Sequence, residues 1–254
     1  MANPYVQQMM PPQEQVPQDI YQQAATYQLG ELRRVYKPTF TNPLVVIGIT
    51  LGAIVLDIAV MVGILVASGY IFYILIAIPI LAIIWCGWAL PHCGTRAYVF
   101  AYGLIYSRGS QIIPMRWEHI QSVQHKIAQS SYRTSHTYTL QLTNGQSLKL
   151  PSALKEVVDL GTTVDNEVGR IQLPQAMQAF SAGQPIQFGR LAIDRNGINN
   201  GKDFFPWQQV DRVAIRNQYV VAEKQGVVLK LSVKVEEVPN FSLLDSMVNH
   251  ITQR

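Results

Sequence analysis

Residues 44–67 (LVVIGITLGAIVLDIAVMVGILVA) and 71–90 (IFYILIAIPILAIIWCGWAL) decide the architecture of this chain. Each run is apolar and about 20 or more residues long, the length that a helix needs to cross a hydrocarbon core of roughly 30 Å. Because only residues 68–70 separate the two runs, the two helices are predicted to cross the membrane and return. We therefore expect a two-span hairpin over residues 43–91, with the regions before and after it on the same side.

The distribution of positive charge predicts the orientation of this hairpin. Arg33, Arg34 and Lys37 precede the first span, Arg96 follows the second, and the connecting loop carries no charge. An excess of Lys and Arg marks the cytoplasmic side of a membrane protein. The sequence thus predicts a multi-pass plasma-membrane protein with both termini in the cytoplasm.

Small residues follow one face of the first span. Gly48 and Gly52 form a GxxxG motif, and Ala59 and Gly63 continue it on the same face. Small residues let membrane helices approach closely. The stripe can face the second span or a second copy of the chain in a homo-oligomer. Since GxxxG is common in apolar helices, we favour packing within the hairpin only slightly.

Asp57 is the one acidic residue in either span, and on a helical wheel it shares a face with Thr50, opposite the glycine stripe. A carboxylate near the bilayer centre costs about 3 kcal/mol on insertion scales, which the aliphatic residues of the span offset. Two interpretations stay open. Asp57 is a proton or ion site or an oligomer contact, or it is a protonated acid bonded to the backbone or to Thr50.

Composition excludes several classes of function. The chain has 254 residues and a formal charge of +4, but its only pair of adjacent cations is Arg33-Arg34, so we expect no nucleic-acid binding. Cys86 and Cys93 lie in and just after the second span, and no Cys/His cluster has metal-ligand spacing. Nucleotide-binding loops and hydrolase motifs are also absent from the sequence. We expect no cofactor, no metal and no enzymatic activity.

The N-terminal region before the hairpin is predicted to contribute little structure. Residues 1–28 are rich in Gln, Pro and Ala without apolar periodicity, a composition typical of a disordered tail. Residues 29–42 form a juxtamembrane segment. Within it, residues 29–37 are predicted to be a short interfacial helix, with its cations at headgroup level.

The region after the hairpin contains an internal repeat. The first copy reads YVFAYGLIY (98–106) and then IIPMRW (112–117), and the second reads LAIDRNGI (191–198) and then FFPW (204–207). Both copies continue as Trp-x-x-[Ile/Val]-x-x-Val. The pattern predicts a strand, a glycine turn, a second strand, and two apolar residues before a proline in each copy.

Further strands and a closing helix follow in each copy. Asn144-Gly145 and Gln225-Gly226 are typical of hairpin turns between alternating segments. Helical spacing appears around Val164 and Val168, and Pro174 is predicted to open a further helix. Asn240 is predicted to cap the N-terminus of the last helix.

Short antiparallel strands closed by one C-terminal helix resemble the pleckstrin-homology-like fold. From about Leu29 the chain resembles a family of bacterial membrane proteins of unknown function with a two-span hairpin and paired pleckstrin-homology-like domains. The residues that carry the resemblance are Leu29-Gly30-Glu31, Tyr102-Gly103-Leu104, Trp117-Glu118-His119-Ile120, Phe188-Gly189, Asn196-Gly197-Ile198 and Pro206-Trp207.

This resemblance implies a fold class and a domain organisation, but no activity. The fold class is a membrane α-hairpin plus an α+β soluble region of two tandem pleckstrin-homology-like domains. The first domain is expected over residues 96–182 and the second over residues 185–254.

Two sets of residues in the repeat are candidates for a role. Trp117 and Ile120 in the first copy correspond to Trp207 and Val210 in the second. We expect these four to fill the core, with each indole N–H bonded to the backbone, rather than to bind a ligand. Phosphoinositide-binding members of the fold hold basic residues in the loop between their first strands. We assign Arg108 and Lys202 to that loop as candidate contacts for lipid headgroups.

These features favour a non-enzymatic membrane protein that binds another protein or lipid headgroups at the cytoplasmic face. The alternative is an oligomeric transport or proton-coupled component centred on Asp57. An enzyme with a pocket between the paired domains is a third, weaker alternative, because the sequence offers it no catalytic constellation.

Overall fold

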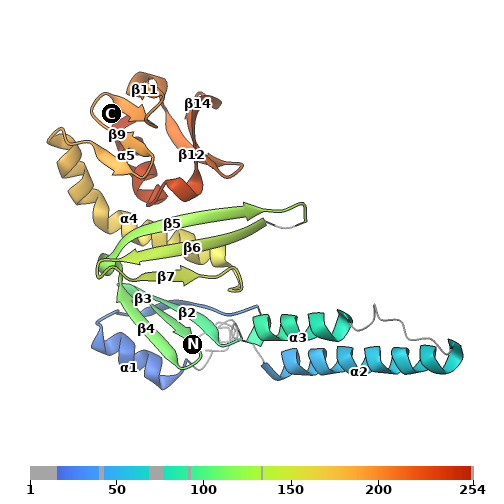
Figure 1. Cartoon of the computed structure of the whole chain (residues 1–254). Coiled ribbons are helices and arrows are strands. Elements are labelled where there is room, and N and C mark those ends of the chain that lie inside the picture. The colour runs from blue at the N-terminus through green and yellow to red at the C-terminus, as the bar shows by residue number, and fades with distance from the viewer. Residues whose placement is uncertain (1–15, 40–42, 69–76, 91–92, 133, 253–254) are drawn as a thin grey trace, which may run out of the picture.

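The computed structural model describes residues 16–39, 43–68, 77–90, 93–132 and 134–252. It is an α+β protein in which two similar units follow each other along the chain, and a helical hairpin extends away from the first unit (Figure 1).

The first unit has two antiparallel sheets and a closing helix. The four-stranded sheet has the order β1-β2-β3-β4, and the three-stranded sheet has the order β5-β6-β7. A 3-10 helix, η4, joins the two sheets. The elements are β1 (Leu32–Tyr36), β2 (Thr95–Phe100), β3 (Gly103–Arg108), β4 (Gln111–Arg116), η4 (Trp117–His119), β5 (Ile120–Gln129), β6 (Thr134–Leu142), β7 (Ser147–Leu150) and α4 (Val157–Ser181).

The second unit repeats this order of elements. Its four-stranded sheet runs β11-β10-β9-β8, its three-stranded sheet runs β12-β13-β14, and a 3-10 helix again joins the two. The elements are β8 (Ile186–Phe188), β9 (Leu191–Ile193), β10 (Gly197–Asn199), β11 (Phe204–Pro206), η5 (Trp207–Gln209), β12 (Arg212–Arg216), β13 (Tyr219–Lys224), β14 (Val227–Lys234), η6 (Val235–Glu237) and α5 (Phe241–Thr252). The strands and turns that the repeat predicts are therefore confirmed.

The apolar hairpin is inserted into the first unit. Its helices are α2 (Pro43–Ser68) and α3 (Ala77–Ala89), which lie against each other. They connect β1 to β2, two neighbouring strands of one sheet. In the second unit the corresponding strands, β8 and β9, are joined by Gly189 and Arg190 alone.

Two predictions about the N-terminal region, the disordered tail and the interfacial helix, are wrong. Residues 18–26 form the helix α1 (Gln18–Thr26) rather than a disordered tail, because Ile20 and Ala24 are buried against Tyr98, Phe100 and Ile105 of the first sheet. Residues 1–15 lie outside the described residues.

The juxtamembrane segment is a strand rather than an interfacial helix. In β1, Arg34, Val35 and Tyr36 pair with Val99, Tyr98 and Ala97 of β2. The first unit therefore includes residues before the hairpin, and its predicted start at residue 96 is wrong. After β1, the Lys37 carbonyl accepts from Lys155 N at 2.8 Å and Thr39 N donates to the Ala153 carbonyl at 2.7 Å. These bonds tie the chain to the first unit just before α2.

Each unit has its own hydrophobic core. In the first, Leu104, Leu140, Leu160 and Val164 bring both sheets and α4 together. In the second, the core residues come from both sheets and α5, and they include Leu191, Ile198, Val213, Leu231, Leu244 and Met247. A helix with one apolar face closes the open side of each pair of sheets, as the 3.6-residue spacing predicts.

The two units meet where α4 passes α5 and where β5 faces the segment before α5. A Cβ on Gly169 of α4 would lie 3.0 Å from Leu243 N of α5, so the helices cross closely at this glycine. The helix α4 continues through Pro174, and the prediction that Pro174 opens a further helix is wrong.

Candidate functional site

The hairpin exposes most of its apolar surface. Of the helices in the described part of the chain, one, over Pro43–Ile64, is long and apolar enough to span a membrane, and α3 contributes a shorter apolar helix over Ala77–Gly87. Large aliphatic side chains are exposed on both helices, among them Leu56 at 67% and Leu81 at 62%. Contiguous exposed apolar surface of this extent marks an interaction site rather than the exterior of a monomeric soluble domain.

Asp57 and Thr50 lie on the buried face of α2, and each is 6% exposed. Val46 of the same face clusters with Ala89 at the end of α3 and with Cys93, where the hairpin meets the first unit. Thr50 Oγ1 donates to the Val46 carbonyl at 2.9 Å. The predicted shared face of Asp57 and Thr50 is thus the face that packs inside the hairpin.

The small-residue stripe faces away from this packed surface. Gly48, Gly52, Ala59 and Gly63 are all exposed. A Cβ on any of the three glycines would meet no heavy atom of the described residues within 4 Å. The prediction that the stripe packs against the second span is therefore wrong, because α3 contacts the opposite face of α2.

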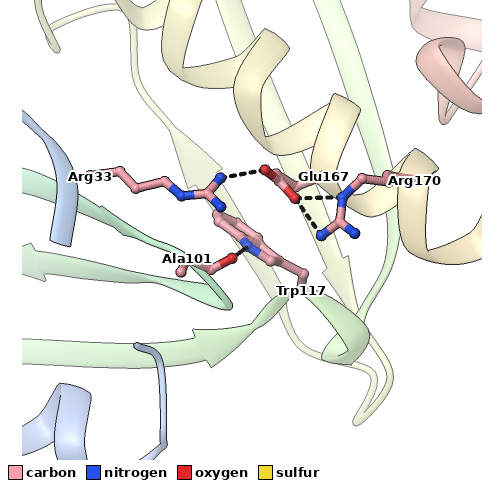
Figure 2. A network of polar contacts seen from close by, with 5 residues as sticks. All are labelled: Arg33, Ala101, Trp117, Glu167 and Arg170. Carbon is pink, nitrogen blue, oxygen red and sulfur yellow. Dashed lines mark hydrogen bonds and ion pairs between the residues drawn. The ribbon is translucent and has the colours of Figure 1, made fainter. Parts of the chain in front are cut away.

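The arginines before the hairpin bind acidic residues of α4 and Glu156, the residue directly before this helix. Figure 2 shows Arg33 of β1 pointing to Glu167, with Arg33 Nη1 and Glu167 Oε1 2.7 Å apart, and Arg170 on the other side of the same carboxylate. Arg34 binds Glu156 at 2.6 Å and Asp159 at 2.7 Å. Both cations therefore tie β1 to the closing helix instead of extending toward headgroups.

The two repeated tryptophans pack against the cores of their units, Trp117 fully buried and Trp207 half-buried. Trp117 is buried beside the Arg33–Glu167 pair, and its indole N–H donates to the Ala101 carbonyl at 3.3 Å (Figure 2). The Trp207 indole N–H donates to the Asp194 carbonyl at 2.9 Å. Ile120 and Val210, three residues after each tryptophan, are 1% and 2% exposed. Each indole thus bonds to the backbone as predicted, and Trp117, Ile120 and Val210 lie in the cores, whereas Trp207 is half-buried and packs against the core of its unit.

Arg108 lies at the end of the first unit from which the hairpin leaves. It is exposed at the end of β3 and pairs with Thr95, the first residue of β2. A Cβ on Gly94 would lie 3.2 Å from Gly109 N in the β3–β4 turn. Arg108 is the last residue of β3, directly before this turn between the third and fourth strands, so its assignment to the loop between the first strands is wrong.

Lys202 is in a turn between a third and a fourth strand, β10 and β11, which corrects its assignment in the same way. Here the fold brings other cations to it. A hollow of about 370 Å³ is lined by Lys202, Arg190 and Lys234, with Glu237 and Asn200. Arg190 binds Glu237 at 3.3 Å, and Lys234 lies 4.0 Å from Glu236. Three cations therefore surround this hollow, with one carboxylate in its lining.

Sequence reasoning missed Arg190 and Lys234. Arg190 lies in the two-residue connection between β8 and β9, the first strands of the second unit. Lys234 is the last residue of β14, its last strand. The Phe188-Gly189 pair indicates a turn in the sequence. Because Arg190 and Lys234 are about 40 residues apart, the sequence does not indicate that they lie close together.

The described residues contain no group of three or more His, Cys, Asp or Glu side chains that could hold a metal ion. The hollow at Lys202 offers cationic and amide groups but no nucleophile paired with a base. These cationic and amide groups are able to bind an anion.

Comparison with known proteins finds no curated protein and no solved structure that matches the chain. A family model matches all of it, residues 1–254, under the description "Family of unknown function (DUF6585)". The chain, with its two sheet-and-helix units and its inserted apolar hairpin, belongs to the DUF6585 family of unknown function.

Proposed function

We propose that this protein is a non-enzymatic, membrane-anchored binding protein that presents two pleckstrin-homology-like domains at the cytoplasmic face of the plasma membrane. The observation that carries the proposal is the insertion of the apolar hairpin between β1 and β2, at the place where the second unit has only Gly189 and Arg190. A membrane anchor at this point is only a few residues along the chain from β1 and β2, and it would hold the first domain close to the bilayer.

The topology of the units supports the pleckstrin-homology-like assignment. Each unit has four antiparallel strands, then three, then a C-terminal helix that covers the core. The same order appears twice, and the tryptophan of the connecting 3-10 helix bonds to an equivalent backbone region in both units.

The exposed aliphatic surface of α2 and α3 supports membrane insertion. A soluble domain would bury this surface, because each large aliphatic side chain gains about 1.5–3 kcal/mol on leaving water. The helix α3 itself is shorter than a full span, but in the sequence the apolar run to which it belongs begins at residue 71. Counted from that residue, the second run reaches the length of a span.

The cations of both domains support binding of anionic headgroups. Arg108 lies at the hairpin end of the first domain, and the hollow of the second combines Arg190, Lys202 and Lys234. Each cation near an anionic membrane surface contributes about 1 kcal/mol. A protein with an acidic surface is the other partner that this charge would attract.

Reconstitution of the full chain tests the proposal. We expect the intact protein to resist alkaline carbonate extraction, and a reporter fused after Arg254 to be active only in the cytoplasm. In nanodiscs, we expect the Lys202→Ala/Lys234→Ala pair to weaken capture of vesicles containing phosphatidylserine. Lys149→Ala with Lys155→Ala is the charge-matched control. Extraction by carbonate, or an exterior reporter, would overturn the anchor.

The buried position of Asp57 favours one second candidate, a proton-coupled transport component formed by several hairpins. Asp57 and Thr50 are both polar residues buried on one face of α2, each 6% exposed. The variants Asp57→Asn and Asp57→Leu separate the two proposals. If the phenotype of intact cells survives both substitutions, the transport candidate fails and the binding role stands.

A further inference from the structure

A second cavity lies at the junction of the two units. Its volume is about 350 Å³, at the lower end of the range for small-molecule pockets. The first unit contributes residues of β5, β6 and α4 to its lining, and the second contributes residues of β12 and α5. A molecule in this cavity would therefore contact both units at once.

Asp165 of α4 is the central polar group of this cavity. Its side chain is almost fully buried, since the residue is 8% exposed. One carboxylate oxygen, Oδ2, accepts from Ser242 N at 2.9 Å and from Ser242 Oγ at 2.8 Å, at the start of α5. The other oxygen, Oδ1, is buried and has no hydrogen-bond partner among the described residues.

An unpaired buried carboxylate oxygen is costly. A buried acceptor without a donor loses its hydration and regains nothing, and native structures rarely keep such a group. Burial raises the pKa of Asp165, against the two hydrogen bonds from Ser242, which lower it. A ligand that donates to Oδ1 would remove this cost.

The charges that line the cavity select the kind of donor. Asp245 of α5 lines the same cavity, and none of the described residues in its lining is a Lys or Arg. Arg212 lies near Asp245, but its guanidinium binds Glu223 at 2.7 Å. His125 is the remaining titratable nitrogen base in the lining, and burial together with His136 lowers its pKa to about 4, so it is neutral at pH 7. The lining is therefore acidic.

The other walls are suited to hydrocarbon. Val158 of α4, Ile215 of β12 and Phe241 of α5 line the cavity around the acidic groups. An ion with a complete hydration shell would leave these side chains without a partner. A cation with an apolar body would cover them and still reach the carboxylate.

We propose that this cavity binds a small organic ammonium ion, a protonated primary or secondary amine on an apolar body. One N–H of the ligand donates to Asp165 Oδ1, Asp245 supplies a second negative charge, and the apolar body lies against Ile215 and Phe241. Because the ligand contacts α4 and α5 together, its binding stabilises the junction between the two units. This inference does not depend on the membrane role proposed above.

Binding of defined amines to the full chain in detergent micelles tests the proposal. Phenethylamine and cyclohexylamine are the probes, and phenethyl alcohol and cyclohexanol are the uncharged isosteres. We expect both amines to give saturable heats of binding and to raise the melting temperature, whereas the alcohols do neither. Equal effects of amine and alcohol, or the absence of saturable amine binding at millimolar concentration, would overturn the proposal.

Two variants locate the site. Asp165→Asn keeps an oxygen acceptor for Ser242 and removes the charge, so we expect it to weaken amine binding by about tenfold or more. Asp245→Asn is expected to weaken binding in the same direction and serves where Asp165→Asn fails to fold. Glu118→Gln, which removes the same charge at an exposed position outside the cavity, should bind as the wild type does. Wild-type affinity in every folded cavity variant would refute the assignment.

Discussion

Two hydrogen bonds join the main chain of Val123, in the first unit, to Asn240, in the second. Val123 N donates to Asn240 Oδ1 at 2.7 Å, and Asn240 N donates to the Val123 carbonyl at 2.9 Å. The Asn240 side chain thus extends the edge of β5 across the junction, while its backbone has a φ of +54°. One residue holds the two units in register just before α5 begins.

Replacement of Asn240 by Ala should destabilise the junction. The change leaves Val123 N buried without its acceptor, at about 1–3 kcal/mol. It also replaces Asn, which tolerates the left-handed region, by Ala, which adopts it less readily. We expect the free energy of unfolding to fall by about 1–3 kcal/mol in urea denaturation of the detergent-solubilised chain.

Asn217→Ala is the matched control, because Asn217 also has a positive φ, of +45°, but lies in the turn before β13 rather than at the junction. A loss that is no larger at Asn240 than at Asn217 would show that the hydrogen bonds to Val123 contribute nothing.

Gly161→Ala should destabilise the first unit, although Ala has a higher helix propensity than Gly. A Cβ on Gly161 of α4 would lie 2.3 Å from the Tyr138 ring. The ring cannot move away easily, because His125 stacks on it with centroids 4.2 Å apart. Overpacking of this kind costs about 1–3 kcal/mol, and helix propensity returns about 1 kcal/mol.

The double variant Gly161→Ala/Tyr138→Leu checks this cause. If the clash with the ring is responsible, Gly161→Ala should cost little or nothing in the Tyr138→Leu background, as measured by the difference in urea midpoint. An equal loss in both backgrounds would contradict the predicted clash.

The stability of the protein should fall as the pH is lowered from about 6.5 to about 4. His125 Nε2 lies 3.0 Å from His136 Nδ1, and burial with the proximity of His136 lowers the pKa of His125 to about 4. In the unfolded chain this histidine takes up a proton near its ordinary pKa of 6.5, whereas in the folded chain it stays neutral there. The folded state therefore loses stability as the pH falls through this range.

His125→Gln should reduce this part of the pH dependence, which the melting temperature measured from pH 7 to pH 4 would show. His119→Gln is the control, since His119 is exposed at the end of η4. Burial also lowers the pKa of His136, so some dependence should remain in the His125 variant. A profile identical to that of the wild type would argue against a neutral, buried His125.

The internal repeat could be predicted from the spacing of its residues. The pairing of strands that lie far apart in the sequence could not. The similar spacing from Gly to Trp in the two copies predicts the elements from β2 to η4 and from β9 to η5. These hairpins form between residues that are close in the sequence, so a local pattern is enough to predict them. The five residues of β1, LRRVY, are too few to distinguish a strand from a helix. Their partner in β2 comes about 60 residues later, and two arginines before an apolar run suggest headgroup contacts instead.

The helix α1 and the N-cap of α5 were mispredicted for a similar reason. The helix QDIYQQAAT has only two buried residues, Ile20 and Ala24, and its order depends on the surface of the first sheet. Asn240 precedes α5 as predicted, but its side chain bonds to β5. Asp165, from a different helix, accepts from Ser242 N at the start of α5. Capping by a residue about 80 positions away leaves no local signal.

The exposed glycine stripe makes self-association of the hairpin testable. Of the two packing partners that the sequence leaves open, the second copy of the chain remains, because Gly48, Gly52 and Gly63 face away from α3. Close approach of two α2 helices requires these small residues. We therefore expect Gly48→Leu/Gly52→Leu to lower energy transfer between labelled copies in liposomes. Gly87→Leu on α3 is the control, since Gly87 is equally open among the described residues. Unchanged transfer in the double variant would mean that the stripe faces lipid only.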